Sequence, residues 1–205
     1  MAKIYLASKS PRRRELLRQI EVPFDLLMFR AGTREDADVD ESTRPREAPR
    51  AYVERIARTK ALGGWSRLAL RHLPRAPVLS ADTTVALGET IYGKPDNARH
   101  AADILKALSG NTHDVRTAVA LQWEDDTFFA ISESRVTFRT LTTREISDYI
   151  TTGEPMDKAG AYAVQGRAAV FIERIEGSYS GIMGLPLFET AALLAQLRNA
   201  HPALV

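Results

Sequence analysis

Apolar residues are distributed along this chain in two patterns that alternate from one end to the other. Short apolar or alternating runs predict strands at residues 4–7, 22–29, 78–87, 114–123, 128–138 and 168–175. Apolar positions spaced three and four apart predict helices that begin at residue 11 and cover residues 51–72, 97–108, 143–151 and 187–199. Because consecutive strands occupy the middle of the chain, we expect an α/β fold with a mixed sheet rather than a regular parallel one.

Capping and turn residues mark the ends of several of these elements. Ser10 followed by Pro11 is a typical helix start, with serine as the N-cap and proline at the first helical position. Thr142 or Thr143 is the expected cap of the helix at 143–151, with Glu145 in its first turn. The two glycines at 63–64 predict a break or kink in the helix at 51–72. The other signals are a hairpin tip at 88–89, a helix end at 109–110 and an acidic turn at 124–126.

Three consecutive arginines, Arg12, Arg13 and Arg14, occupy the first turn of the first helix. The positive end of a helix dipole disfavours cations there, by roughly 0.3–1 kcal/mol for each. One interpretation is a set of solvated arginines on an exposed turn. We favour the other, in which the guanidinium groups and the free backbone N–H groups hold an anion such as phosphate. The segment is not a Walker loop, because the pattern G-x-x-x-x-G-K-[ST] occurs nowhere in the chain.

Asp82 stands in an otherwise apolar predicted strand. A buried carboxylate is strongly unfavourable unless it meets a cation, a metal ion or several hydrogen bonds. Asp82 therefore either bonds within its own loop or acts as a general base, taking a proton from water beside a hydrated divalent ion. We favour the general base.

Three further polar residues are candidates to contact a phosphorylated ligand. Lys94 projects from a turn stiffened by glycine and proline, Lys60 lies beside the apolar face of the helix at 51–72, and Gln165 offers both a donor and an acceptor. Each lysine has a simpler explanation, since turn lysines are usually solvated and Lys60 can extend along the surface to reach water. Small residues around Gly160 allow close backbone approach. The glycines of 177–184 are explained as well by a turn before the last helix as by a cofactor loop.

Composition restricts the class of protein without identifying its function. The 205 residues, 44% hydrophobic and 26% charged, are typical of a globular protein, and we expect a single domain over residues 1–205. A net charge of +2 gives little support to a nucleic-acid partner. The chain has no cysteine, which excludes disulfides, thiolate metal sites and a cysteine nucleophile. With no signal-peptide hydrophobic region and no apolar run of membrane length, we expect a cytoplasmic protein without membrane contact.

The remaining titratable residues carry only weak indications of metal binding. The four histidines are His72, His100, His113 and His201. No two of them occur at metal-ligand spacing, which argues against a zinc site. The acidic segment 35–41 reads as a solvated loop, but one of its carboxylates is a candidate to share a metal ion with Asp82.

Taken in chain order, these motifs resemble those of the Maf family over nearly the whole chain. The matching segments are LASKSPRR at 6–13, EAP at 47–49 with YV at 52–53, RTKA at 58–61, ADT at 81–83, GKP at 93–95, LSG at 108–110, KAGAY at 158–162 and GLPL at 184–187. So many matches in the same order are highly specific.

The resemblance implies both a fold and an activity. The implied fold is a strongly twisted mixed sheet with flanking helices and two lobes around a central cleft, similar to that of the inosine-triphosphate pyrophosphatases. The implied activity is metal-dependent hydrolysis of a nucleoside triphosphate to the monophosphate and pyrophosphate, with Mg²⁺ or Mn²⁺ as cofactor. The family also makes a homodimer the expected assembly.

The resemblance assigns roles to particular residues. Asp82 matches the family's catalytic carboxylate, and the matches to its phosphate-side residues are Ser8, Arg13, Lys60 and Lys94. The family's acidic pair after the second strand matches Arg34-Glu35 best, so Glu35 is expected to share the metal ion with Asp82. The pair Asp40-Glu41 is a second possibility.

Arg12, Thr83 and Gln165 resemble the branch of the family that contains the dTTP/UTP pyrophosphatases. The 7-methyl-GTP branch has an aromatic residue in place of Arg12 and a glutamate in place of Gln165, which suits a cationic base. A neutral glutamine suits the mixed donor and acceptor edge of uracil or thymine. We therefore expect dTTP and UTP as substrates, with a pyrophosphatase for 7-methyl-GTP or another modified nucleotide as the alternative. A non-enzymatic regulator of cell division or nucleic-acid binder is a further alternative, but it has no use for a carboxylate in an apolar strand.

Overall fold

The structure is a computed structural model that describes residues 3–28 and 39–204. Its strands are β1 (Ile4–Leu6), β2 (Phe24–Leu26), β3 (Val78–Leu87), β4 (Thr90–Tyr92), β5 (Thr112–Trp123), β6 (Asp126–Phe138) and β7 (Ile172–Glu176). They form one seven-stranded sheet in the order β2-β1-β3-β5-β6-β7, with β4 paired to β3. β1 is parallel to β2 and β3, whereas the other pairs are antiparallel. The expectation of a mixed sheet is confirmed.

Helices and short 3-10 turns flank this sheet in the described part of the chain. The α-helices are α1 (Pro11–Gln19), α2 (Pro49–Leu70), α3 (Ala98–Leu108), α4 (Thr143–Ile150), α5 (Tyr179–Met183) and α6 (Leu187–Ala200). The 3-10 turns are η1 (Glu154–Asp157), η2 (Ala159–Ala161), η3 (Arg167–Phe171) and η4 (Pro202–Leu204).

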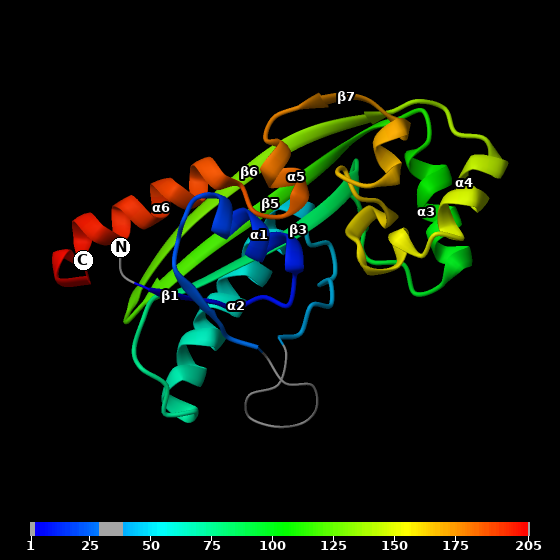
Figure 1. The fold of residues 1–205 in the computed structure, drawn as a ribbon. Coiled ribbons are helices and arrows are strands. Elements are labelled where there is room, and N and C mark those ends of the chain that lie inside the picture. Colours follow the sequence, from blue (N-terminus) through cyan, green and yellow to red (C-terminus); the bar gives the residue numbers. More distant parts are fainter. Residues whose placement is uncertain (1–2, 29–38, 205) are drawn as a thin grey trace.

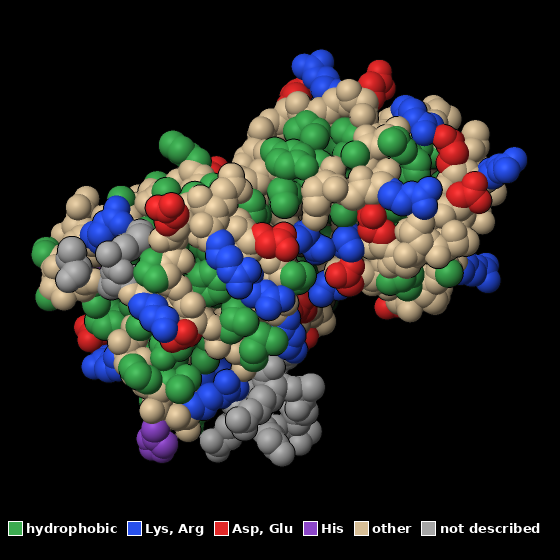
Figure 2. Space-filling model, in the orientation of Figure 1, with side chains coloured by type: hydrophobic (Ala, Val, Ile, Leu, Met, Phe, Trp, Pro, Cys, Tyr) green, Lys and Arg blue, Asp and Glu red, His purple; other side chains and the backbone are tan. Residues whose placement is uncertain are grey.

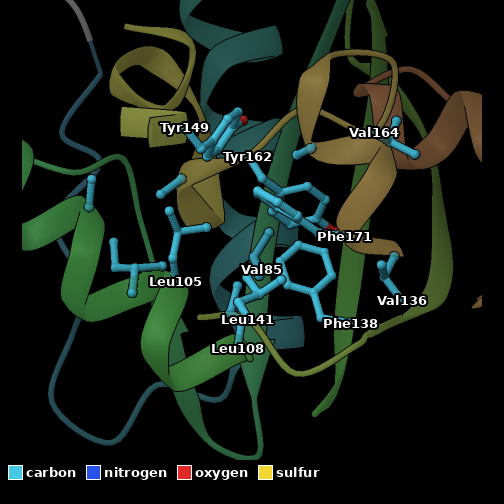
Figure 3. Packing of buried hydrophobic residues seen from close by; sticks show 14 of the residues in the cluster. Val85, Leu105, Leu108, Val136, Phe138, Leu141, Tyr149, Tyr162, Val164 and Phe171 are labelled. Carbon is cyan, nitrogen blue, oxygen red and sulfur yellow. The ribbon is translucent and has the colours of Figure 1, made fainter. Parts of the chain in front are cut away.

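The molecule has two lobes, and the long strands β5 and β6 run through both (Figure 1). One lobe holds α3, α4 and the neighbouring 3-10 turns, and its core includes Leu105, Phe138, Tyr149 and Phe171 (Figure 3). In the other lobe, α1, α2 and α6 lie along the sheet, and a second apolar cluster joins β1, α1, β3, β5 and α6. The α/β class with a twisted mixed sheet and flanking helices is therefore confirmed.

The predicted helix starts are formed by the residues that the sequence indicates. The Ser10 side chain accepts a hydrogen bond from the N–H of Arg13 at 3.5 Å, directly before Pro11. Thr142 and Glu145 form a reciprocal capping box at the start of α4. Such caps satisfy backbone N–H groups that have no partner inside the helix.

The break predicted at Gly63–Gly64 is wrong, because α2 continues through both glycines to Leu70. A Cβ atom on Gly64 would lie 2.8 Å from the Val78 side chain of β3. Glycine therefore lets the helix lie closely on the sheet, and this packing offsets the roughly 1 kcal/mol that glycine costs a helix relative to alanine.

Two predicted strands are longer than the strands that form. Of residues 168–175, the first four belong to η3, and β7 begins only at Ile172. Ala168 and Phe171 are both buried, and a short apolar run of this kind does not distinguish a strand from a helical turn. Of residues 22–29, only Phe24–Leu26 form β2, and residue 29 lies outside the described residues.

Candidate active site

A cavity of about 650 Å³ lies where the two lobes meet. Acidic and basic side chains gather in this region between the lobes (Figure 2). The charged residues that line the cavity are Lys9, Arg12, Arg13, Glu41, Lys60, Asp82, Lys94, Asp157 and Lys158. Six of these are cations and three are anions, so the cavity favours an anionic ligand.

The cavity brings together every predicted site residue that the structure describes. The residues concerned are Ser8, Arg12, Arg13, Lys60, Asp82, Thr83, Lys94 and Gln165. They come from the β1–α1 turn, the first turn of α1, α2, β3, the turn after β4 and the turn before η3. Glu35 lies outside the described residues, whereas Glu41, from the second possible acidic pair, lines the cavity.

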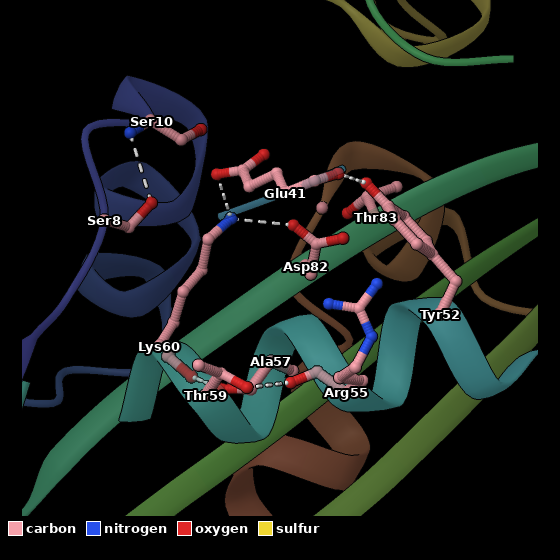
Figure 4. Close-up of polar contacts among 12 residues, drawn as sticks. Ser8, Ser10, Glu41, Tyr52, Arg55, Ala57, Thr59, Lys60, Asp82 and Thr83 are labelled. Atoms are coloured by element: carbon pink, nitrogen blue, oxygen red, sulfur yellow. Dashed lines mark hydrogen bonds and ion pairs between the residues drawn. The ribbon is translucent and has the colours of Figure 1, made fainter. Parts of the chain in front are cut away.

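Asp82 and Glu41 meet at the ammonium group of Lys60 (Figure 4). Lys60 Nζ lies 2.9 Å from Asp82 Oδ1 and 2.7 Å from Glu41 Oε1. The Lys60 and Asp82 side chains are only 12% and 11% exposed, whereas that of Glu41 is 48% exposed. Lys60 is therefore an ion-pair partner of Asp82, and the simpler explanation that it extends into water is wrong.

Burial raises the pKa of the Asp82 carboxyl group above its usual range, and the positive charges of Lys60 and Arg13 oppose this effect. A carboxylate in such surroundings binds a proton more readily than a solvated aspartate does. A buried carboxylate that faces a cavity and is held in place by a fixed cation can act as a general base.

The segment that carries Glu41 is attached to α2 by two side chains of that helix. The Tyr52 hydroxyl donates to the carbonyl of Glu41 at 2.9 Å, and burial raises the pKa of Tyr52 to about 12, which keeps this hydroxyl protonated. Arg55 donates to the carbonyl of Ser42 at 2.9 Å and pairs with Glu47. The neighbouring Asp40 accepts the backbone N–H of Ser42 instead of facing the cavity.

The predicted arginine cluster divides among different roles. The Arg13 guanidinium turns inward and donates to the Gly184 carbonyl at 2.7 Å, to Ser8 Oγ at 3.2 Å and to Thr83 Oγ1 at 3.2 Å. Arg12 lines the cavity and lies 4.0 Å from Asp157 of the other lobe, whereas Arg14 is not among the lining residues. The cavity thus receives a rigid cation from Arg13 and a second cation from Arg12, whose side chain is 23% exposed.

The opposite wall of the cavity comes from the turns that follow α4. Gly160 has a φ of 71°, and a Cβ atom there would lie 2.9 Å from the Val85 side chain of β3. Its N–H donates to the carbonyl of Gly93 at 3.1 Å, which brings the Lys94 turn beside this wall. The close approach expected around Gly160 is therefore confirmed, and glycine is required there.

Several groups at the site were not identified from the sequence as ligand contacts. Lys158 lies in a segment chosen for its small residues, yet Lys158 itself lines the cavity. The sequence signal that could have identified Lys158 is the pair of adjacent charges, Asp157 and Lys158, close to Gly160. The carbonyl of Gly184, which fixes Arg13, has no sequence signal because every residue carries a carbonyl.

Histidine takes no part in lining the cavity. His113 is buried beside Tyr162, with Nε2 2.9 Å from the tyrosine hydroxyl, whereas its Nδ1 is buried without a hydrogen-bond partner among the described residues, so it is satisfied at one ring nitrogen only. Within residues 3–28 and 39–204 there is no group of three or more His, Cys, Asp or Glu side chains placed to hold a metal ion. No helix in these residues is long and apolar enough to cross a membrane.

Comparison with known proteins identifies close relatives. The family model described as Maf-like protein matches residues 3–197. A dTTP/UTP pyrophosphatase of Aromatoleum aromaticum is 62% identical over 194 residues, covering 94% of both chains. A protein of the same name from Cupriavidus pinatubonensis is 56% identical, covering 95% of this chain and 96% of its own. One from Nitrosomonas europaea is 53% identical, covering 94% of this chain and 93% of its own.

The similarity to a solved structure is much weaker. The Staphylococcus aureus Ham1 protein is 13% identical with a TM-score of 0.45, over 66% of this chain and 71% of that chain. A similarity this distant does not bear on function.

Proposed function

The chain belongs to the Maf family, and we propose that it is a nucleoside triphosphate pyrophosphatase acting on dTTP and UTP. The observation that carries the proposal is Asp82, a buried carboxylate paired with Lys60 at a cavity whose charged lining residues are mostly cations. The names of the relatives point to the same substrates. A cavity of about 650 Å³ lies within the ordinary range of small-molecule sites.

In the proposed reaction, water attacks the α-phosphorus and Asp82 accepts the proton that the water loses. The bond between the α-phosphorus and the bridging oxygen breaks, and pyrophosphate leaves with the electron pair of that bond. The nucleoside monophosphate remains. The raised pKa of Asp82 favours proton acceptance, and the ion pair with Lys60 orients the carboxylate before substrate and metal ion bind.

The remaining lining residues bind the two ends of the substrate in this proposal. The residues that contact the phosphates are Ser8, Arg13, Lys60 and Lys94. The backbone N–H groups at the start of α1 also favour an anion. Gln165 reads the base, Arg12 helps to position the nucleotide, and Thr83 binds the substrate beside Arg13. Gln165 is exposed and lines the cavity, so its amide can meet uracil or thymine there.

The carboxylates of the cavity fit a divalent ion, which we propose as Mg²⁺ or Mn²⁺. Asp82 and Glu41 both pair with the Lys60 ammonium group, so a divalent ion held by both carboxylates would replace that group between them and leave it free to contact phosphate. Mg²⁺ is commonly held by one or two carboxylates together with substrate phosphates, so a group of three protein ligands is not required. When bound, such an ion neutralises charge on the phosphates. Glu41 is the described alternative to Glu35 as the second carboxylate.

Three broader proposals accompany this function. We propose a single Maf-like domain, supported by a family match that covers residues 3–197. The proposed homodimer and the cytoplasmic location rest on the sequence considerations given above.

The test is a panel of nucleoside triphosphates assayed with Mg²⁺ or Mn²⁺ and with excess chelator, with the phosphate product identified. We expect UTP and dTTP to yield pyrophosphate and a nucleoside monophosphate, and we expect this activity to be lost when excess chelator is present. Orthophosphate as the initial product would refute the pyrophosphatase. A strong preference for 7-methyl-GTP would support the alternative substrate instead.

A further inference from the structure

Beneath the turn that carries Gln165 lies Glu154, the first residue of η1, which does not line the cavity. Its carboxylate is half-buried and uses both oxygens. Oε1 accepts the Tyr149 hydroxyl at 2.8 Å, and Oε2 accepts the backbone N–H of Arg167 at 3.0 Å. Glu154 therefore joins α4 to the backbone that directly follows Gln165 and Gly166.

The same carboxylate packs against Gly166. A Cβ atom on Gly166 would lie 2.2 Å from Glu154 Oε1 and 2.5 Å from its carboxyl carbon. A glutamate is normally flexible enough to move away from such a contact. Here its two hydrogen bonds oppose that movement, so the observed position of the Glu154 carboxylate requires glycine at 166.

The backbone of Glu154 also holds the cavity wall. Its carbonyl accepts the ammonium group of Lys158 at 2.7 Å, and Lys158 lines the cavity. The turn at Gln165 is closed by a hydrogen bond from the N–H of Gly166 to the carbonyl of Ala163 at 3.1 Å. The carbonyl of Gly166 also accepts the N–H of Ala169 at 3.1 Å, so the Glu154 carboxylate is the contact that ties this locally bonded turn to α4.

We propose that Glu154 is a positioning residue for base recognition: its carboxylate fixes the backbone at 166–167 and thereby sets where the Gln165 amide meets the base. The inference rests on the proposed function, in which Gln165 reads a pyrimidine. Glu154 touches neither the substrate nor the reacting atoms. Its loss should therefore raise KM for pyrimidine triphosphates and reduce base selectivity, with a smaller effect on kcat.

Two substitutions at Glu154 distinguish the effect of its hydrogen bonds from the effect of its negative charge. Glu154→Ala removes both bonds and should lower kcat/KM for UTP by roughly ten- to a hundredfold, the scale of a misplaced binding group. The preference for UTP over GTP should fall with it. Glu154→Gln should stay close to wild type, because its amide oxygen can accept the Arg167 N–H while its amide nitrogen donates to the Tyr149 hydroxyl oxygen.

Gly166→Ala gives an independent test of the same contact. In the wild-type background the added methyl group displaces the Glu154 carboxylate and should reproduce the effect of Glu154→Ala. In the Glu154→Ala background the clash is gone, so the second substitution should add little. Losses that multiply in the double variant would overturn the proposal.

Glu145→Ala is the matched control. Glu145 Oε2 also accepts a backbone N–H in this lobe, that of Thr142 at 2.8 Å, but Glu145 does not line the cavity. This variant should lower Tm and leave the preference for UTP unchanged. If folded Glu154→Ala keeps the wild-type preference, or if Glu145→Ala loses it equally, the proposal is overturned. If wild type releases no pyrophosphate from UTP, the proposed function fails first and this inference fails with it.

Discussion

Acid should destabilise this protein through His113, which is 1% exposed. Its Nε2 lies 2.9 Å from the Tyr162 hydroxyl and its ring packs edge-to-face on Phe138, while Nδ1 is buried with no partner among the described residues. Burial lowers the pKa of His113 to about 4, and the nearby negative charge of Asp114 acts in the opposite direction. Protonation of the His113 imidazole is therefore unfavourable in the folded protein.

The direction and size of the effect follow from linkage. Above about pH 6.5, His113 is neutral in the folded and unfolded chains and contributes nothing to the pH dependence. Between about pH 6.5 and about 4, the unfolded chain binds a proton that the folded protein does not. The free energy of unfolding should fall by about 1.4 kcal/mol for each pH unit over this interval, or roughly 3 kcal/mol in total.

The assay compares wild type with His113→Gln, whose amide can still bond the Tyr162 hydroxyl but does not titrate. Urea unfolding, followed by the fluorescence of Trp65 and Trp123, gives the free energy of unfolding at several pH values between 7.5 and 4. The variant retains every other titratable group, so the difference between the two curves isolates His113. Curves that stay parallel down to pH 4 would refute the reasoning.

Three substitutions test the cavity directly. Asp82→Asn should lower turnover at least about a hundredfold, the scale of a lost general base, and near-normal turnover in a folded variant would exclude that role. Arg13→Ala should weaken triphosphate binding in calorimetry and lower Tm, because three hydrogen bonds are lost; an unchanged Kd would leave Arg13 a purely structural residue. Gln165→Glu should lower kcat/KM for dTTP and UTP by about ten- to a hundredfold, since a carboxylate cannot donate to the O4 carbonyl of the base. Equal losses on 7-methyl-GTP would show that Gln165 shapes the pocket without reading the base.

The sequence was informative where a local pattern determines the outcome. Ser10 and Pro11 start α1 because a cap and a fixed φ act within one turn. Asp82 was identified because a charge inside an apolar strand requires a partner, and Lys60 was a candidate because of its position on an apolar helix face.

Prediction failed where a distant contact determines the outcome. Gly64 stays helical because Val78, far along the chain, packs against it. The inward turn of Arg13 depends on a carbonyl 171 residues away. The contact of Glu41 with Lys60 depends on Tyr52 holding the backbone of that segment, which no spacing in the sequence reveals. Each case requires the folded chain to bring the partners together.

The two long strands β5 and β6 also determine how the lobes can move. Their pairing is continuous from Thr112 opposite Thr137 to Trp123 opposite Asp126, and both lobes pack on this single ribbon. A hinge would need a short flexible connection between the lobes, but here the connection is a hydrogen-bonded ladder. Opening or closing the cavity must therefore occur as a change of twist spread over many residues. For the same reason, neither lobe is a separable fragment, because cutting the chain between them would divide a strand pair that both cores require.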